Sequence, residues 1–292
     1  MANVTITTAA THIDEIWSPE LNRAVENDLV ITARFDDKSR LMPHGDIFHW
    51  PARHNLTANT KSAGSDATPE AIVEGDQTFT VSTHQIVAQE IESIAEIQSR
   101  YDIRNEFTLA AAYSLARAMD VAAAALFDDN TTQTVGILGS ELTEDNLIRA
   151  WQYLMDSAIK PPYITIVSPA TYAGFLKVDK FTNQLYIGES PRAVRQAEVG
   201  NLYSSKVYVS QLTVGTAPNS SGHVWGHIDS GGHFFKIIQK PPTTDTWYSP
   251  LAKAWIMAAD QIYGVFERQE ADEAAAVTTT ARLGGVRLQS LK

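Results

Sequence analysis

The sequence predicts an α+β fold that begins with a long N-terminal arm. Residues from Met1 to about Thr83 carry apolar side chains but form no core of their own. The segment from Asn105 to Phe127, NEFTLAAAYSLARAMDVAAAALF, has the pattern of a long helix built mainly from small residues. From Lys206 onwards, strand-like runs and Gly-rich loops dominate the chain. The arm, the helix and the β-rich second half together favour the α+β class.

Composition excludes several classes of protein. The 292 residues suffice for one large or two modest domains. The absence of cysteine excludes disulfides and thiolate metal sites, and it fits a reducing cytoplasm. The N-terminus lacks the basic and apolar segments of a secretory signal, and nowhere do 18 apolar residues follow one another. We therefore expect a soluble protein that is not exported.

The arm carries apolar residues that need cover from outside it. Ser18-Pro19-Glu20 combines an N-cap with Pro at the first helical position, which predicts a short helix within the arm. Too few residues surround this helix to bury its apolar side chains. We expect other copies of the chain to cover the following residues: Ile16, Trp17, Leu21, Val30, Ile31, Phe35, Ile47, Phe48 and Trp50.

A long two-stranded hairpin is expected next. Asp46 to Leu56 forms one limb and Thr78 to Val87 the other, on either side of a segment rich in Pro and Gly. An isolated hairpin is only marginally stable in water, so this one is expected to lie against a neighbour. Ala88 to Ser99 is expected to form a brief helix before the long one.

Small residues follow helical spacing within the long helix, where Asp102 or Asn105 provides the cap. Such a stripe lets a helix lie close to a sheet. The residues expected on it are Phe107, Ala110, Ala111, Ser114, Ala118, Val121, Ala122 and Ala125.

Further elements follow from caps and β-branched runs. Thr143 caps an amphipathic helix that ends before Pro161-Pro162. The strand Tyr163 to Val167 and the short helix Pro169 to Leu176 come next. The strands expected after these are Lys206 to Val214 and His233 to Gln239, and Ala254 to Phe266 fits a helix or a strand, of which we favour the strand.

Residues with catalytic potential are sparse. His223, His227 and His233 form the one close histidine group, but the glycines among them are incompatible with the helix of a metalloprotease motif. We interpret them as loop and strand histidines and predict no metal site, no cofactor and no enzymatic activity. The alternative from this class is a hydrolase that uses the loop from Gly222 to His233.

The order of these elements resembles the major capsid protein of tailed phages, the Hong Kong 97-like fold. The most similar stretches are Asn146 to Lys177, NLIRAWQYLMDSAIKPPYITIVSPATYAGFLK, and Ala259-Asp260-Gln261-Ile262 followed by Arg268 to Val277. The second stretch is similar to the closing strand of the family and its Arg-Pro-Glu-Ala ending. Gln269 stands where that ending has Pro.

The resemblance implies a division of the chain into four parts. Residues 1–35 would be the N-terminal arm and residues 36–84 the extended loop. Residues 85–140 and 245–292 would form the peripheral domain, with residues 105–127 as its spine helix. The axial domain would comprise residues 141–244.

The implied function is that of a major capsid protein, which forms pentamers and hexamers in an icosahedral shell around double-stranded DNA. The net charge of −11 and the absence of Lys/Arg clusters suit a wall that encloses DNA without adhering to it. Implied partners are other copies, a separate scaffolding protein, a portal and a decoration protein, with assembly in the host cytoplasm and no membrane. The alternative with the same fold is an encapsulin-like nanocompartment shell.

Contacts between subunits are expected on the arm and the loop. Lys61 lies near the tip of the extended loop, where some family members form a Lys–Asn isopeptide bond. Exposed lysines are usually solvated, and we interpret Lys61 as a solvated surface residue that forms no cross-link. Cohesion is then expected from buried area, which commonly reaches about 2,000 Å² or more in obligate interfaces. The residues expected at contacts are Trp17, Phe35, Phe48, Trp50, Arg53, Lys61 and Phe79.

Overall fold

The computed structural model describes most of the chain. The described residues are 26–27, 29–53, 58–67, 69, 74–99, 101–129, 133–178, 201–202, 205–213, 215, 219–228, 231–268 and 284–291. The helix expected after Ser18 and the contact residue Trp17 lie outside them, as does most of the stretch from Arg268 to Val277.

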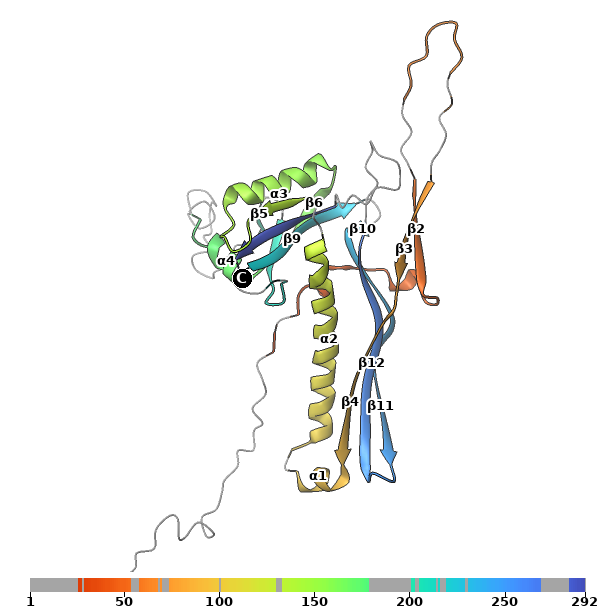
Figure 1. The fold of residues 1–292 in the computed structure, drawn as a ribbon, viewed down its shortest axis with the longest axis vertical. Helices are drawn as coiled ribbons and strands as arrows, with labels where there is room; N and C mark the ends of the chain where they lie inside the picture. Colours follow the sequence, from red (N-terminus) through yellow and green to blue (C-terminus); the bar gives the residue numbers. More distant parts are fainter. Residues whose placement is uncertain are drawn as a thin grey trace, which may run out of the picture.

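A long four-stranded sheet runs through the molecule (Figure 1). β12 pairs antiparallel with both β11 and β4, and the short β1 pairs parallel with β11. The strand expected at Ala254 to Phe266 is confirmed. The helix expected from Ala88 begins later, because β4 stays paired with β12 as far as Glu92. The bounds are β1 (Asp36–Asp37), β4 (Thr83–Glu92), α1 (Ser93–Gln98), β11 (Phe234–Ser249) and β12 (Ala254–Glu267).

The long helix α2 (Ile103–Asp129) lies beside β4 and β12 and confirms the expected spine helix (Figure 1). The expected stripe is confirmed at Phe107 and Ala111, which are buried, but it is wrong at Ala110, Ser114, Val121 and Ala125, which are exposed. Alanine lies on every side of this helix, so spacing alone does not identify the side that meets the sheet. The buried residues are Phe107, Ala111, Leu115, Asp120, Ala123, Ala124 and Phe127.

Length and composition alone would allow α2 to cross a membrane. In this structure the buried side chains of its first half pack against the long sheet, and Ala123, Ala124 and Phe127 join a second core cluster with Trp225 of β9 (Asn219–Ile228). Phe107, Ala111 and Leu115 form one core cluster with Met257 and Ala259 of β12. This half of the helix therefore stiffens the sheet.

A second, seven-stranded sheet lies beside the end of α2, in the order β5-β13-β9-β6-β8-β7 with β10 paired to β9. The expected helices at Thr143 and Pro169 are confirmed, and each is capped by a hydroxyl, of which that of Thr143 was predicted. Thr143 Oγ1 accepts from the Asn146 N–H at 3.4 Å, and Ser168 Oγ accepts from the Thr171 N–H at 3.2 Å. The bounds are β5 (Thr134–Gly136), α3 (Glu144–Asp156), β6 (Lys160–Val167), α4 (Pro169–Phe175), β7 (Asn201–Leu202), β8 (Ser205–Val209), β9 (Asn219–Ile228), β10 (Gly231–Gly232) and β13 (Gly285–Leu291).

The two sheets divide the chain differently from the expected domains. β11 begins at Phe234 and belongs to the long sheet, ten residues before the expected boundary at residue 244. β13 was expected with the spine helix, but it pairs with β9 and β5 in the second sheet. Pairings between strands so far apart in sequence leave no local signal, so the division implied by the resemblance had no support from the residues at these two places.

The hairpin is formed by β2 (Ile47–Arg53) and β3 (Glu74–Thr80), and it extends beyond the end of the long sheet (Figure 1). The expected second limb ran on to Val87. The structure instead ends the pairing at Thr80 and begins β4 at Thr83, which belongs to the long sheet. Among the described residues before the hairpin, two 3-10 turns are present, η2 (Thr32–Arg34) and η3 (Ser39–Leu41).

The segment before β1 is fixed to α2 by a buried carboxylate. Asp120 is fully buried and accepts from the Ile31 N–H at 3.1 Å and the Thr32 N–H at 2.8 Å, and the Thr32 hydroxyl also donates to it. Ile31 and Phe35 are therefore buried within their own chain. The expectation that other copies cover these two residues is wrong, because Trp225 and Phe234 already enclose Phe35.

Replacing Asp120 with Ala is expected to destabilise the unassembled chain by about 3 kcal/mol, because it leaves buried donors without an acceptor. Urea unfolding followed by circular dichroism measures this. Asp120→Asn keeps one acceptor oxygen and should cost less. A free energy of unfolding unchanged in Asp120→Ala would contradict the assigned anchoring.

Candidate assembly surfaces

α1 and the turn between β11 and β12 lie at the end of the long sheet away from the hairpin (Figure 1), and both elements carry exposed apolar residues. Ile97 on α1 is 83% exposed and Leu251, in the turn between β11 and β12, is 99% exposed. A patch of this kind marks an interaction surface when it is held rigidly. We use the name distal patch for the exposed apolar residues of this end, of which the neighbouring strand residues Trp247 and Tyr248 point to opposite faces of β11; the set is Ile94, Ile97, Trp247, Tyr248 and Leu251.

Polar contacts hold α1 and the β11–β12 turn, the elements that carry the distal patch, in place. The Ser93 N–H and hydroxyl donate to the Lys253 carbonyl at 3.0 and 2.8 Å, which ties α1 to the turn. The Arg104 guanidinium lies 4.4 Å from the Trp255 ring centroid and donates to Glu96 at 2.7 Å. The patch is thus presented by a preformed surface, which lowers the entropy lost on contact.

Two further apolar side chains, Leu109 and Val121, are exposed on α2 at positions twelve residues apart. On β4, the outermost strand of the long sheet, Ile86 is exposed as well. These residues lie between the distal patch and the hairpin along the molecule. They extend the apolar surface available to a neighbouring chain.

The base of the hairpin is anchored on its own chain by aromatic rings. Phe79 lies 5.0 Å from Phe235 and 5.3 Å from Phe266 between ring centroids, and Trp50 lies 5.4 Å from Phe235. Phe48 packs on Trp50 at 5.7 Å. These expected contact residues are half-buried, so only their remaining surface is available to another chain.

The other expected contact residues fall in three places. Phe35 is buried in its own core and is not available for contact. Lys61 is exposed in the segment between β2 and β3. Arg53 ends β2, where its backbone pairs with Glu74, and its side chain lies outside the description.

Asp260 lies where the pairing of β11 and β12 changes register, and its carboxylate contacts three hydrogen-bonding side chains. Lys240 Nζ lies 2.6 Å from both carboxylate oxygens, His84 Nε2 lies 2.9 Å from Oδ2, and the Thr243 hydroxyl donates at 3.1 Å. The hydrogen bond from Lys240, followed by that with His84, lowers the pKa of Asp260 from 3.8 to about 2. The contact joins β4, β11 and β12.

The lowered pKa of Asp260 predicts acid sensitivity of the long sheet. A carboxyl with a depressed pKa in the folded state stabilises above its unfolded pKa of 3.8, and this contribution is lost as the pH falls towards about 2. Urea unfolding from about pH 5 to pH 2 should therefore show Asp260→Asn converging with the native chain at the acid end. Asp245→Asn, at an exposed position of β11, is the matched control. A constant difference between native and Asp260→Asn chains at every pH would contradict the prediction.

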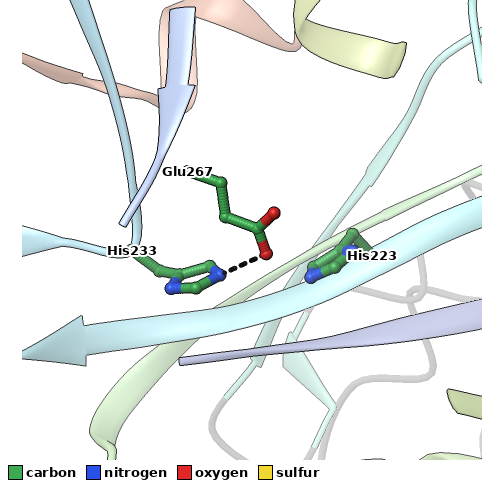
Figure 2. Close-up of side chains that lie close together, drawn as sticks. All are labelled: His223, His233 and Glu267. Atoms are coloured by element: carbon green, nitrogen blue, oxygen red, sulfur yellow. Dashed lines mark hydrogen bonds and ion pairs between the residues drawn. The ribbon is translucent and has the colours of Figure 1, made fainter. Parts of the chain in front are cut away.

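Two of the three grouped histidines meet in the fold. His223 on β9 and His233 before β11 lie with their ring centroids 6.3 Å apart, and Glu267 at the end of β12 joins them. Figure 2 shows the Glu267 carboxylate pointing between the two imidazole rings. The side chain of His227 lies outside the description. Sequence reasoning missed Glu267 because it follows His233 by 34 residues.

Comparison with known proteins identifies relatives of this architecture. Residues 90–283 match the profile of a family described as phage capsid protein. No curated protein matches the chain.

Among solved structures, the chain is similar to that of Mycobacterium phage Che8, with a TM-score of 0.79 and 16% identity over 94% of this chain and 96% of that one. It is also similar to the head structure of Helicobacter pylori bacteriophage KHP40, with a TM-score of 0.79 and 11% identity over 100% and 99%. The asymmetric unit of the bacteriophage PhiM1 mature capsid matches at a TM-score of 0.70 and 15% identity, over 95% and 91%. These likenesses confirm the expected Hong Kong 97-like fold.

Proposed function

The chain belongs to the phage capsid protein family, and we propose that its copies assemble as pentamers and hexamers into the icosahedral shell around the double-stranded DNA of a tailed phage. It is a structural protein whose place is the virion capsid. The observation that carries the finer proposal is the distal patch. An elongated subunit with rigid apolar residues at one end and a projecting hairpin at the other is suited to contacts with several neighbours (Figure 1).

Closed symmetry explains why two separate surfaces are needed. A subunit in a ring contacts the next subunit through unlike surfaces, and rings must then contact one another to close a shell. We assign the exposed apolar residues of α2 and the hairpin to contacts within rings, and the distal patch to contacts between rings. Obligate interfaces of about 2,000 Å² or more would supply the cohesion without a covalent link.

The charge of the subunit fits enclosure of DNA rather than specific binding to it. A formal charge of −11 per chain repels phosphate, so packaged DNA would not adhere to the wall. We further propose a separate scaffolding protein, a portal and a decoration protein as partners, with assembly in the host cytoplasm.

Electron microscopy of the purified chain, alone and after expression with the other head proteins of its phage, tests the proposal. Five- and six-fold rings or closed shells are the expected result. DNA-filled, tailed particles containing the chain would distinguish a phage capsid from a nanocompartment. A discrete monomer or dimer under every condition would overturn the proposed assembly.

A further inference from the structure

Three buried side chains meet at the junction of the two sheets. His223 and His233 are fully buried, and Glu267 is 8% exposed. His223 belongs to the second sheet through β9, whereas Glu267 ends β12 of the long sheet. His233 lies between them, directly before β11. Each residue thus comes from a different strand or connection, and the cluster spans both halves of the fold.

The backbone holds this meeting point in a fixed register. Phe234, which follows His233, is the pairing partner of Glu267, and the Arg268 N–H donates to the His233 carbonyl at 2.9 Å. His223 pairs with Arg287 across β9 and β13. His223 and Glu267 are therefore held by strand pairing, and His233 is held by the one-residue connection between β10 and β11.

The ligand atoms of the cluster lie at distances suited to a metal ion. His233 Nε2 and Glu267 Oε1 are 2.9 Å apart, and one donor atom from each of the three residues lies within 4.8 Å of the others. Ligands around a tetrahedral zinc ion lie about 2.0–2.2 Å from it, which separates them by about 3.3 Å. Rotations of the two imidazoles and the carboxylate would be needed to bring the ligand atoms, which lie within 4.8 Å of one another, to this separation.

The surroundings of the cluster are apolar and aromatic. Phe127 stacks on His223 with 5.4 Å between ring centroids, and Phe234 lies 5.0 Å from His223 and 4.8 Å from His233. A carboxylate in such surroundings is costly unless a positive charge compensates it. His233 already forms a hydrogen bond with Glu267 at 2.9 Å, and a divalent cation bound by all three side chains would add positive charge beside this buried carboxylate.

Gly285 on β13 makes room for the two rings. A Cβ atom at this position would lie 2.3 Å from His223 Nε2 and 2.9 Å from His233 Cδ2. Any larger residue would push the imidazoles out of their positions. The absence of a side chain at Gly285 is therefore part of the construction of the cluster.

We propose that His223, His233 and Glu267 bind one divalent transition-metal ion, of which Zn²⁺ is the representative, and that the ion ties the second sheet to the long sheet. Two imidazoles and one carboxylate form a ligand set that such ions prefer over Mg²⁺ or Ca²⁺. The near-complete burial of all three residues indicates a structural role. This inference concerns the subunit itself and holds whether or not the proposed assembly is correct.

The test uses the full chain, purified without a histidine tag, stripped with a chelator and then equilibrated with Zn²⁺ or, separately, Mg²⁺. After gel filtration, elemental mass spectrometry should find about one zinc per chain and no magnesium. The zinc-loaded chain should unfold at a higher temperature than the stripped chain. Co²⁺ in place of Zn²⁺ should give the visible absorption of a tetrahedral site.

Substitutions of the ligands distinguish zinc binding by the cluster from nonspecific zinc binding elsewhere on the chain. His223→Gln and Glu267→Gln should each lower zinc affinity by more than about tenfold and abolish the cobalt absorption. His44→Gln, at an exposed histidine elsewhere, is the matched control and should bind zinc normally. If one ligand variant fails to fold, the other variant and the cobalt spectrum of the native chain still show whether the cluster binds the metal ion.

Three results would overturn the metal site. The first is a folded native chain that retains less than about a tenth of an equivalent of zinc, against the expected single equivalent. The second is zinc bound equally well by the folded ligand variants. The third is loss of binding in His44→Gln.

Discussion

Replacing Ile97 and Leu251 together with Asp is expected to stop shell formation while leaving the isolated chain folded. Both side chains are almost fully exposed, so the subunit core does not depend on them. In a contact between copies, each new carboxylate would have to leave water without a partner. A cost of about 3 kcal/mol per contact weakens association about 100-fold, and a closed shell repeats the contact many times.

Light scattering and electron microscopy measure this outcome. Circular dichroism and the thermal midpoint of the unassembled chain report its folding. The matched control replaces Ile97 with Leu and Leu251 with Met, which keeps an apolar patch of similar size. Shells of normal yield from the double Asp variant would show that the distal patch is not a contact between copies.

Shortening the hairpin is the second change with a large expected effect. Replacing residues 54–73 with Asn-Gly joins Arg53 to Glu74, the last pair of β2 and β3, through a two-residue turn. The aromatic base around Phe79 and Phe235 is kept, so the chain should fold with a nearly unchanged thermal midpoint. The projecting segment that would reach a neighbour is lost, and closed shells are expected to disappear.

The shortened variant is examined by sedimentation and electron microscopy beside a matched control. Lys61→Ala changes one exposed residue of the same segment and should assemble normally. The control also tests the interpretation of Lys61 as a solvated surface residue. If Lys61 cross-linked the subunits, shells of the native chain would give a ladder of covalent oligomers on a denaturing gel, and shells of Lys61→Ala would not. Intact shells from the shortened variant would show that the hairpin is not needed for assembly.

Local signals predicted many elements correctly. The run of small residues predicted α2, the Thr143 cap predicted α3, and Pro169 predicted α4. These predictions hold because caps and helical spacing depend on residues only a few positions apart. The strand at Ala254 to Phe266 was also correctly favoured over a helix. Its β-branched and aromatic residues fit a half-buried strand.

The errors concern contacts between residues distant in sequence. The buried side of α2 was misplaced because alanines surround the helix, and β13 was grouped with the wrong sheet because strand pairing is decided by the whole fold. Phe35 was expected on an interface, but Asp120 fixes the preceding residues against α2 from 88 and 89 positions away. Glu267 was missed for the same reason.

The central claim is that copies of this chain contact one another through the distal patch and the hairpin in a closed shell. A cryo-electron microscopy reconstruction of the assembled particle tests it most directly. The account predicts pentamers and hexamers of this fold, with Ile97 and Leu251 buried against a neighbouring copy and the β2–β3 hairpin lying over an adjacent subunit. A closed shell in which the distal patch faces solvent and the hairpin touches no other copy would contradict it.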